Sequence, residues 1–432
     1  MLKSENEISK KGYDFRHLLN FRIGFEVERH RVNLAGEIST FPYPKGIGNE
    51  VENAWITTDF METMTEVVTP VAQTAEQAFV ALDKISNVLK ASLAEEELLW
   101  PLSMPPTLPK NLADIDIAHT TAEKRAYFIN WVQRHNFQRA TPTGVHINLG
   151  LNLQFIESND LSRDEINELY MKVARGFMKN RYVLTYFFGA SPIAEENYFL
   201  ESQHAVNFVR SIRQSKLGFG TRYPGDYSSV EKYVAKILNG IRTGELFADN
   251  DFHAPVRLRG TQDLNHLASE GIDHIELRVL DFDPWSRDGI SADAVHLIRL
   301  MAAYFIEYEE GPFNLTQADQ VNEEVSLSSP TDKLHRGKMW SFIDDLKKFA
   351  YQIQAGQVFY DVLNRLTSQL QNPENTISAR LIANIKNGSL NDFALNQATL
   401  NKMETPKIQT IKSVFEDSDG RVNSDDLKAH LF

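Results

Sequence analysis

The chain has 432 residues, 42% of them hydrophobic and 24% charged, and these values are ordinary for a globular protein with a sizeable core. Its formal net charge of −13 argues against a general nucleic-acid binder. Because it has no cysteine, disulfides, thiolate metal ligands and cysteine nucleophiles are excluded. The N-terminus is polar, and the most apolar later stretch, Ala292–Tyr308, is interrupted by charged residues. We therefore expect a cytoplasmic protein without a signal peptide, a membrane span or a membrane partner.

The chain order suggests a single domain of residues 1–432, with a core of about 20–385 and a helical C-terminal tail of about 386–432. Capping patterns begin two helices, one at Thr74 and Gln77 and one at Ser162 and Glu165. The second of these helices should run to about residue 187 and end at Gly189. Residues 339–354 and 358–370 also have a helical pattern.

Three segments alternate between apolar and polar residues, as strands with one buried face do: residues 21–32, 145–151 and 274–279. A fourth, residues 55–70, is strand-like in part. Side chains two residues apart in a strand share a face. The polar faces therefore carry Glu26 and Glu28, then His146 and Asn148, then His274, Glu276 and Arg278, while the fourth segment carries Asp59, Glu62 and Glu66.

If these strands lie side by side, their polar faces form one surface of carboxylates, an imidazole, an amide and a guanidinium. Oxygen ligands with one imidazole suit Mg²⁺ or Mn²⁺, and an arginine beside them suits a phosphate. The alternative is an antiparallel sheet whose polar face meets only water. Alternation alone does not decide between them. The chain has no GxxxxGK[ST], GxGxxG, HExxH or GxSxG motif.

Eight segments, read in order, resemble the bacterial glutamate–cysteine ligases. They are GFEVERHRVN (24–33), WITTDFMETMTEVVTP (55–70), LWPLSMPP (99–106), TGVHINLGLN (143–152), FGASPIAE (188–195), VRSIRQSKLGF (209–219), IELRVLDFDPW (275–285) and NTISARLI (375–382). The resemblance covers about residues 24–382. It implies an α+β, glutamine-synthetase-like fold, in which a curved, mainly antiparallel sheet forms an active-site funnel with helices around it.

The resemblance also implies a reaction. The γ-carboxylate of glutamate attacks the γ-phosphate of ATP, and cysteine displaces phosphate from the γ-glutamyl phosphate, which is the first step of glutathione synthesis. Mg²⁺ or Mn²⁺ would be bound by Glu26, Glu28, Glu66, His146 and Glu276. The implied catalytic residues are Glu26, Glu276, Arg278, which would contact the ATP phosphates, and Arg125. The implied substrate-binding residues are Asp59, Phe60, Tyr127, Asn148, Arg213, Phe219 and His253.

The sequence departs from the family pattern at three positions. Phe128 replaces the usual arginine, and Arg125, which shares its helical face, is expected to substitute for it. Phe219 and His253 replace two tyrosines that bind the cysteine carboxylate in the family. Two alternatives follow, a γ-glutamyl ligase with a different amino acid or amine as acceptor, and a ligand-binding paralogue without turnover. Because the chain ends soon after the ligase-like region, a second ATP-using domain is not expected.

Overall fold

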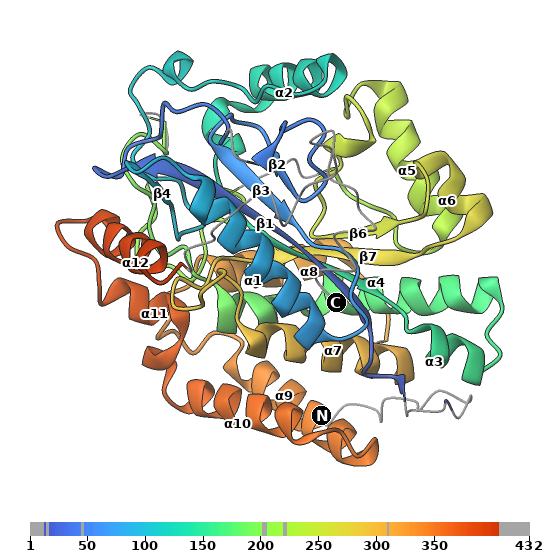
Figure 1. The fold of residues 1–432 in the computed structure, drawn as a ribbon. Coiled ribbons are helices and arrows are strands. Elements are labelled where there is room, and N and C mark those ends of the chain that lie inside the picture. The colour runs from blue at the N-terminus through green and yellow to red at the C-terminus, as the bar shows by residue number, and fades with distance from the viewer. Residues whose placement is uncertain are drawn as a thin grey trace.

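An antiparallel sheet forms the centre of the protein, in a computed structural model that describes residues 13, 17–44, 47–200, 205–218, 223–308 and 311–405 (Figure 1). The strand order along the sheet is β2-β3-β1-β5-β7-β6, and β4 pairs with the end of β1. The strands are β1 (Arg22–Asn33), β2 (Ile56–Thr58), β3 (Met64–Val68), β4 (Glu97–Leu99), β5 (Val145–Gly150), β6 (Val256–Arg259) and β7 (His274–Leu280). The long first strand therefore lies between β3, which follows it soon in the chain, and β5, which comes more than 100 residues later.

The strand register brings the polar residues of different strands together. Glu26 lies opposite His146, Glu28 lies opposite Glu66, and Asn148 lies opposite Glu276. The alternate residues of the same strands face an apolar core, in which Phe25, Val27, Ile147 and Leu277 are at most 1% exposed. A slip of one residue in any strand would move its carboxylates into this core, so the apolar pattern also fixes the positions of the polar groups.

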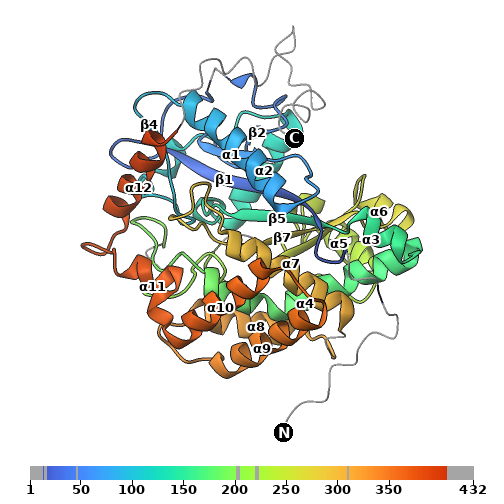
Figure 2. The ribbon, with the colours of Figure 1, turned by 60° about the horizontal axis from the view of Figure 1, so that its bottom comes forward.

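Helices surround the sheet, with α1 packed on β1 and β3 and α4 packed on β6 and β7 (Figures 1 and 2). The larger helices are α1 (Ala75–Ser92), α2 (Ala122–His135), α4 (Arg163–Phe188), α5 (Val230–Thr243), α7 (Ala292–Glu307), α8 (Leu315–Ser326), α9 (Arg336–Gln352), α10 (Gln357–Gln371) and α12 (Asn391–Met403). Short helices are α3 (Leu153–Ser158), α6 (Leu264–Glu270) and α11 (Ile377–Ile382).

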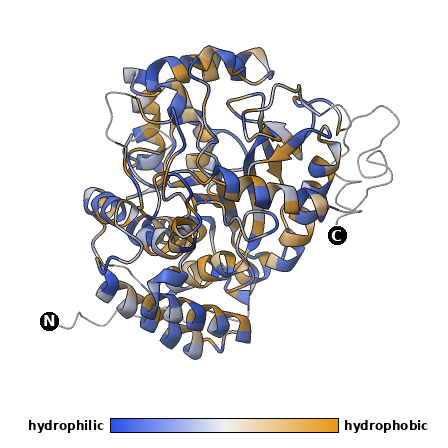
Figure 3. Cartoon of the chain, turned by 90° about the vertical axis from the view of Figure 1, so that its left-hand side faces the viewer, coloured by the Kyte–Doolittle hydropathy of each residue, from blue (hydrophilic) through white to orange (hydrophobic). Residues whose placement is uncertain are grey.

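The predicted helix boundaries agree closely with the structure. Thr74 caps α1 by accepting from the backbone NH of Gln77, and Ser162 and Glu165 form a complete capping box on α4. The last residue of α4 is Phe188, and Gly189 is its C-cap, as predicted. Helices seen in Figure 3 have one hydrophilic and one hydrophobic side, which fits their packing around a common core.

The α+β class, with an antiparallel sheet and surrounding helices, is confirmed. The apolar stretch near residue 300 forms α7, which is buried in the core. Among the described residues, no helix has the length and apolar character needed to cross a membrane. Strands β4 and β6 were not predicted, and Phe219 and most of the predicted C-terminal tail lie outside the described residues.

Candidate active site

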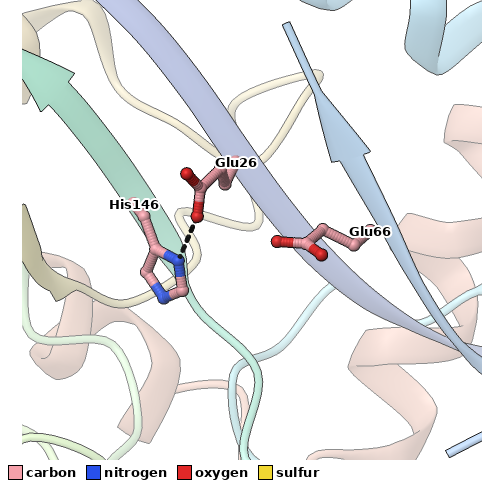
Figure 4. A group of neighbouring side chains, drawn as sticks. All are labelled: Glu26, Glu66 and His146. Atoms are coloured by element: carbon pink, nitrogen blue, oxygen red, sulfur yellow. Dashed lines mark hydrogen bonds and ion pairs between the residues drawn. The ribbon is translucent and has the colours of Figure 1, made fainter. Parts of the chain in front are cut away.

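Three side chains from adjacent strands form the centre of the polar surface (Figure 4). Glu26 of β1, Glu66 of β3 and His146 of β5 each offer one ligand atom, and these atoms lie within 4.8 Å of one another. Nδ1 of His146 lies 3.1 Å from Oε2 of Glu26. A proton on Nδ1 that is donated to this carboxylate leaves the lone pair of Nε2 available to a metal ion. The sequence prediction placed all three residues in one metal site.

Three carboxyl groups, Glu66 in this cluster and Glu28 and Asp59 beside it, are held in unfavourable surroundings for a negative charge. Burial and the charge of Asp59 raise the pKa of Glu28 to about 8. Burial, followed by the charges of Glu26, Asp59 and Glu28, raises the pKa of Glu66 well above its ordinary value. Burial also raises the pKa of Asp59. Carboxylates that repel one another in this way are stabilised by a bound cation.

Glu26 differs from these groups because its hydrogen bonds lower its pKa below the ordinary value. Burial and the charge of Glu276 act to raise its pKa, but hydrogen bonds with His146 and Asn148 outweigh them, and its pKa is lowered. The side-chain amide of Asn148 donates to Oε1 of Glu26 at 2.7 Å. Asn148, expected to bind substrate, therefore also holds Glu26 in place.

The donor set fits a divalent cation such as Mg²⁺ or Mn²⁺. Nε2 of His146 is buried, makes no hydrogen bond within the described residues, and lies 3.6 Å from Oε1 of Glu28. Burial, followed by the charge of Arg278, lowers the pKa of His146 to about 4, so its ring is neutral and can act as a ligand at physiological pH. A buried nitrogen without a hydrogen-bond partner, placed among carboxylates, fits the position of a metal ligand.

Glu276 lies beside this cluster, but its oxygens contact arginines. Arg278 donates to Oε1 at 2.7 Å, Arg259 donates to Oε2 at 2.6 Å, and Nη1 of Arg257 lies 3.9 Å from Oε1. Although burial opposes ionisation, these three charges hold the pKa of Glu276 well below its usual range. Glu276 thus anchors a group of guanidinium groups next to the carboxylates, in addition to its expected role as a metal ligand.

Arg257 and Arg259 were missed by the sequence analysis because strand β6 was missed. The segment VRLR is only four residues long, yet it alternates, and its two arginines share one face of the strand. In the sheet Arg257 lies opposite Glu276. Together with Arg278 they provide three cations on adjacent strands, which suits a polyphosphate.

Arg125 does not join the carboxylate surface. Its Nη1 donates to the backbone carbonyls of Ile117 and Ala118, at 2.6 and 2.9 Å. Phe128 occupies the position where the family usually has arginine. It is 1% exposed, and the centre of its ring lies 4.4 Å from the centre of the Phe60 ring. The expectation that Arg125 substitutes for an arginine at 128 is therefore not supported.

Lys124 is the α2 cation that acts on the site. Its ammonium group lies 5.4 Å from the centre of the Phe128 ring and donates to the backbone carbonyl of Thr58. Its positive charge acts to lower the pKa of both Asp59 and Glu66. Sequence reasoning missed this residue because two neighbouring cations on a helix differ in direction by about 100°, and composition does not reveal which one faces the sheet.

We expect Lys124→Met to weaken catalysis more than Arg125→Met. Loss of the Lys124 charge removes a group that favours ionised Asp59 and Glu66, so the Mg²⁺ concentration for half-maximal rate should rise about tenfold. Arg125→Met should change this concentration less than about threefold. Initial rates of phosphate release over a range of Mg²⁺ would measure both. Equal effects of the two substitutions would contradict this assignment.

An aromatic cluster lies beside the carboxylates and includes most of the expected acceptor residues. The ring of Phe60 packs 6.1 Å from Tyr127, 5.0 Å from Trp131 and 6.4 Å from His253. The hydroxyl of Tyr127 lies 3.4 Å from Nε2 of His253. Burial, followed by the charges of Arg278 and Arg257, lowers the pKa of His253 well below its ordinary value. His253 is thus a neutral hydrogen-bonding group.

A cavity next to this cluster is lined by Arg213, His253 and Arg278. The cavity has a volume of about 110 Å³. Nε of Arg213 is buried and makes no hydrogen bond within the described residues, while its Nη1 donates to the carbonyl of Leu280. Gly144 is required beneath Arg213, because a Cβ there would overlap Nη2 of the guanidinium. The cavity therefore offers a fixed cation to a carboxylate.

Asp281 orders the chain around Arg213. Its Oδ2 accepts hydrogen bonds from the backbone NH of Ala190 at 2.8 Å, from Ser191 at 2.7 Å and from Ser211 at 2.6 Å. Its Oδ1 lies 3.7 Å from Nη1 of Arg213. The segments that precede and contain Arg213 are thereby attached to the end of β7, which also carries Arg278.

Glu62 is buried. The sequence alone allowed it to lie at a strand edge in contact with water, and the structure does not place it there. The residue is 5% exposed. Its two oxygens accept from the backbone NH groups of Tyr43 and His119, at 3.1 and 3.0 Å. Glu62 therefore holds two loops together and is satisfied by the backbone.

The fold and the site together define a class of protein. Carboxylates and an imidazole suited to a divalent cation lie beside three arginines suited to a polyphosphate, on one face of an antiparallel sheet. An aromatic cavity with a fixed cation adjoins them. This combination is typical of enzymes that activate a carboxyl group with a nucleoside triphosphate.

The chain belongs to the glutamate-cysteine ligase family, whose model matches residues 8–327. It is 32% identical over 411 residues to a glutathione biosynthesis bifunctional protein of Enterococcus faecalis, covering 90% of this chain and 54% of that protein. A protein of the same description from Streptococcus agalactiae is 30% identical over 409 residues, covering 91% of this chain and 54% of that one. The chain spans about half the length of the curated relatives it matches.

Two solved structures resemble this fold. A bifunctional glutathione synthetase from Pasteurella multocida matches with a TM-score of 0.83 and 28% identity, over 90% of this chain and 53% of that one. A glutamate–cysteine ligase from Francisella tularensis in complex with AMP also has a TM-score of 0.83, at 20% identity, over 95% and 94% of the two chains. The second match supports the fold alone.

Proposed function

We propose that this protein is an ATP-dependent ligase that joins the γ-carboxylate of L-glutamate to the amino group of L-cysteine. The observation that carries the proposal is the cluster of Glu26, Glu66 and His146 beside the arginines of β6 and β7, in a chain of the glutamate-cysteine ligase family. A glutamate carboxylate that attacks ATP meets strong charge repulsion, and this arrangement opposes that repulsion.

Each group would have a definite task in the reaction. Glu26, Glu28, Glu66 and His146, with Glu276 beside them, would hold Mg²⁺ or Mn²⁺, which neutralises phosphate charge when bound. Arg278 would contact the phosphates directly, and Arg257 and Arg259 would add positive charge. Asp59 and Asn148, which lie next to Glu28 and Glu26, would orient the substrates.

The acceptor would bind in the cavity beside the aromatic cluster. Arg213 would pair with its carboxylate, while Phe60 and Tyr127 would exclude water from its side chain. The nearby carboxylates would favour the approach of the amine. The amine then attacks the acyl phosphate, a carbon–nitrogen bond forms, and inorganic phosphate leaves with the proton passing to a nearby base or water.

Phosphate release from ATP, measured with Mg²⁺, glutamate and a panel of amines, tests this proposal. The panel contains cysteine, 2-aminobutyrate, other amino acids and simple amines, and mass spectrometry identifies the products. We expect glutamate-dependent release with cysteine and a γ-glutamylcysteine product. Absence of ATP turnover with every acceptor would reject the enzymatic proposal and leave a ligand-binding protein.

A different acceptor is the second candidate, and the neutral His253 favours it. The family pattern has tyrosine at this position, whereas His253 here lies within hydrogen-bonding distance of Tyr127 and inside an aromatic cluster. An acceptor that lacks a carboxylate would need fewer hydroxyl donors in this cavity. Turnover that is faster with a simple amine than with cysteine would favour this candidate.

We expect His253→Tyr to lower the cysteine KM about tenfold while the ATP KM stays the same. The added hydroxyl would donate a hydrogen bond to the acceptor carboxylate, a contact worth about 1–1.5 kcal/mol. Steady-state kinetics with cysteine and 2-aminobutyrate measure the effect. Trp131→Phe, which changes the same cluster without adding a donor, is the control. An unchanged cysteine KM in His253→Tyr would contradict this account of the cavity.

A further inference from the structure

A second cavity lies on the side of β1 that faces away from the metal ligands. Arg29 follows Glu28 in the strand, so its side chain points to the opposite face. The cavity is lined by Arg29, by Lys90 near the end of α1, by Trp100 after β4, by Phe282 after β7, and by Lys402 of α12. Figures 1 and 2 both show α12 beside β4, at one end of the sheet.

Arg29 is a largely buried cation with no hydrogen-bond or ion-pair partner for its side chain among the described residues. The residue is 5% exposed, and its guanidinium carbon lies 5.5 Å from the centre of the Phe282 ring. Within the part of the chain that the structure describes, no group accepts a hydrogen bond from its side chain or forms an ion pair with it. A guanidinium has five N–H donors, and those of Arg29 that reach the cavity would donate to an anion bound there.

The other charges around the cavity do not supply the missing acceptor. The carboxylate of Asp288, which attracts Arg29 from a distance, forms its ion pair with Lys90, where Nζ lies 3.0 Å from Oδ1. Asp283 uses its two oxygens to accept from the backbone NH of Trp285 and from the hydroxyl of Ser286. Both carboxylates near the cavity are therefore engaged elsewhere.

The two other cations of the lining, Lys402 and Arg287, have partners of their own. Nζ of Lys402 donates to the backbone carbonyls of Ala94, Glu95 and Glu97. Arg287 pairs with Asp83 outside the cavity, at 3.0 Å. Of the four cationic side chains in the lining, Lys90 and Arg287 are thus paired with carboxylates, whereas Arg29 and Lys402 form no ion pair within the described residues. Such a surplus of positive charge in a sheltered space favours an anion.

We propose that this cavity binds a small inorganic anion of chloride size, held between Arg29 and Lys90. The cavity has a volume of about 20 Å³, which is on the scale of one small occupant. A single anion would accept from the guanidinium of Arg29 and reduce its repulsion with Lys90. It would also connect β1, α1 and the turn after β7, which come from distant parts of the chain.

Bromide, which has a strong anomalous X-ray signal, tests the location directly. Crystals of the wild-type protein, grown without halide and soaked in sodium bromide, are expected to show an anomalous peak within hydrogen-bonding distance of Arg29. In solution, chloride at about 100 mM should raise Tm by about 2–4 °C relative to gluconate at equal ionic strength. Excess broadening of the ³⁵Cl resonance should accompany this rise.

Two cavity variants and one control separate specific binding from a general salt effect. Arg29→Met should abolish the bromide peak and the chloride-dependent Tm shift, and Lys90→Met should weaken chloride binding at least tenfold. Lys236→Met, which removes a cation that lies over the Tyr223 ring outside the cavity, should leave both signals unchanged.

Four results would overturn the proposal. One is the absence of bromide from the cavity of the wild-type crystal. Another is equal chloride dependence in the wild type and in Arg29→Met. If Arg29→Met fails to fold, an unaltered chloride response in Lys90→Met would have the same consequence. Stronger binding of sulfate or phosphate than of chloride in this cavity would reject the assignment by size.

Discussion

Glu66→Gln is expected to reduce glutamate- and Mg²⁺-dependent phosphate release from ATP at least about 100-fold. The carboxylate lies within 4.8 Å of the ligand atoms of Glu26 and His146, and an amide oxygen is a much weaker ligand than a carboxylate. The substitution also removes a group whose ionisation is opposed by burial and by three neighbouring carboxylates. The metal-free variant should therefore unfold at the same temperature as the wild type or at a higher one.

The combination of lost activity and retained stability is what distinguishes a metal ligand from a structural residue. Glu37→Gln provides the control, because Glu37 is exposed in the turn after β1, where it accepts from Asn33. Its activity should equal that of the wild type. Wild-type rates in Glu66→Gln at limiting Mg²⁺ would exclude this residue from the metal site.

Binding of Mg²⁺ at pH 7 is expected to release about one proton from Glu28, and Glu66, whose pKa is also raised, adds to the total release. Its pKa is raised to about 8, so the carboxyl group is mostly protonated at pH 7 and must ionise to contact the cation. Calorimetry of Mg²⁺ binding in two buffers with different heats of ionisation measures the number of protons. The release should fall as pH passes 8, and Glu28→Gln should reduce it at pH 7.

The same raised pKa predicts the pH dependence of stability without metal. The folded state retains a proton on Glu28 up to about pH 8, whereas the unfolded chain loses it near pH 4.5. Since the folded state binds more protons in this window, its free energy of unfolding falls as pH rises from about 4.5 to 8. Denaturant titrations at pH 5.5 and 7.5 should show this loss, and saturating Mg²⁺ should reverse it. A Glu28→Gln protein with the wild-type pH slope would contradict the assignment.

The strands that were predicted from sequence are those long enough to repeat their alternation. Residues 22–33 and 274–280 repeat the alternation of apolar and polar residues several times. The capped helices begin and end within a few residues of their predicted bounds. Strands β4 and β6 have three and four residues, too few for a periodic pattern to stand out. The arginines of β6 were therefore missed, although they contact the predicted Glu276.

The composition of the site could be predicted, but the contacts within it could not. Alternation places Glu26 and His146 on polar faces, while their proximity depends on a register between strands more than 100 residues apart. Likewise, Arg125 and Lys124 are equivalent cations in the sequence. Only the direction of α2 relative to the sheet determines that Lys124 acts on Asp59 and Glu66.

The central position of β1 has a consequence for synthesis of the chain on the ribosome. This strand is made first, but its neighbour β5 begins at residue 145, and β6 and β7 are made only after residue 255. A nascent chain that ends before β6 exposes the unpaired edge of β5, a site for aggregation. It also carries the acidic groups of β1 and β3 before Arg257, Arg259 and Arg278 exist to balance them. Such distant pairings favour slow folding, so the sheet and its charge balance are completed late.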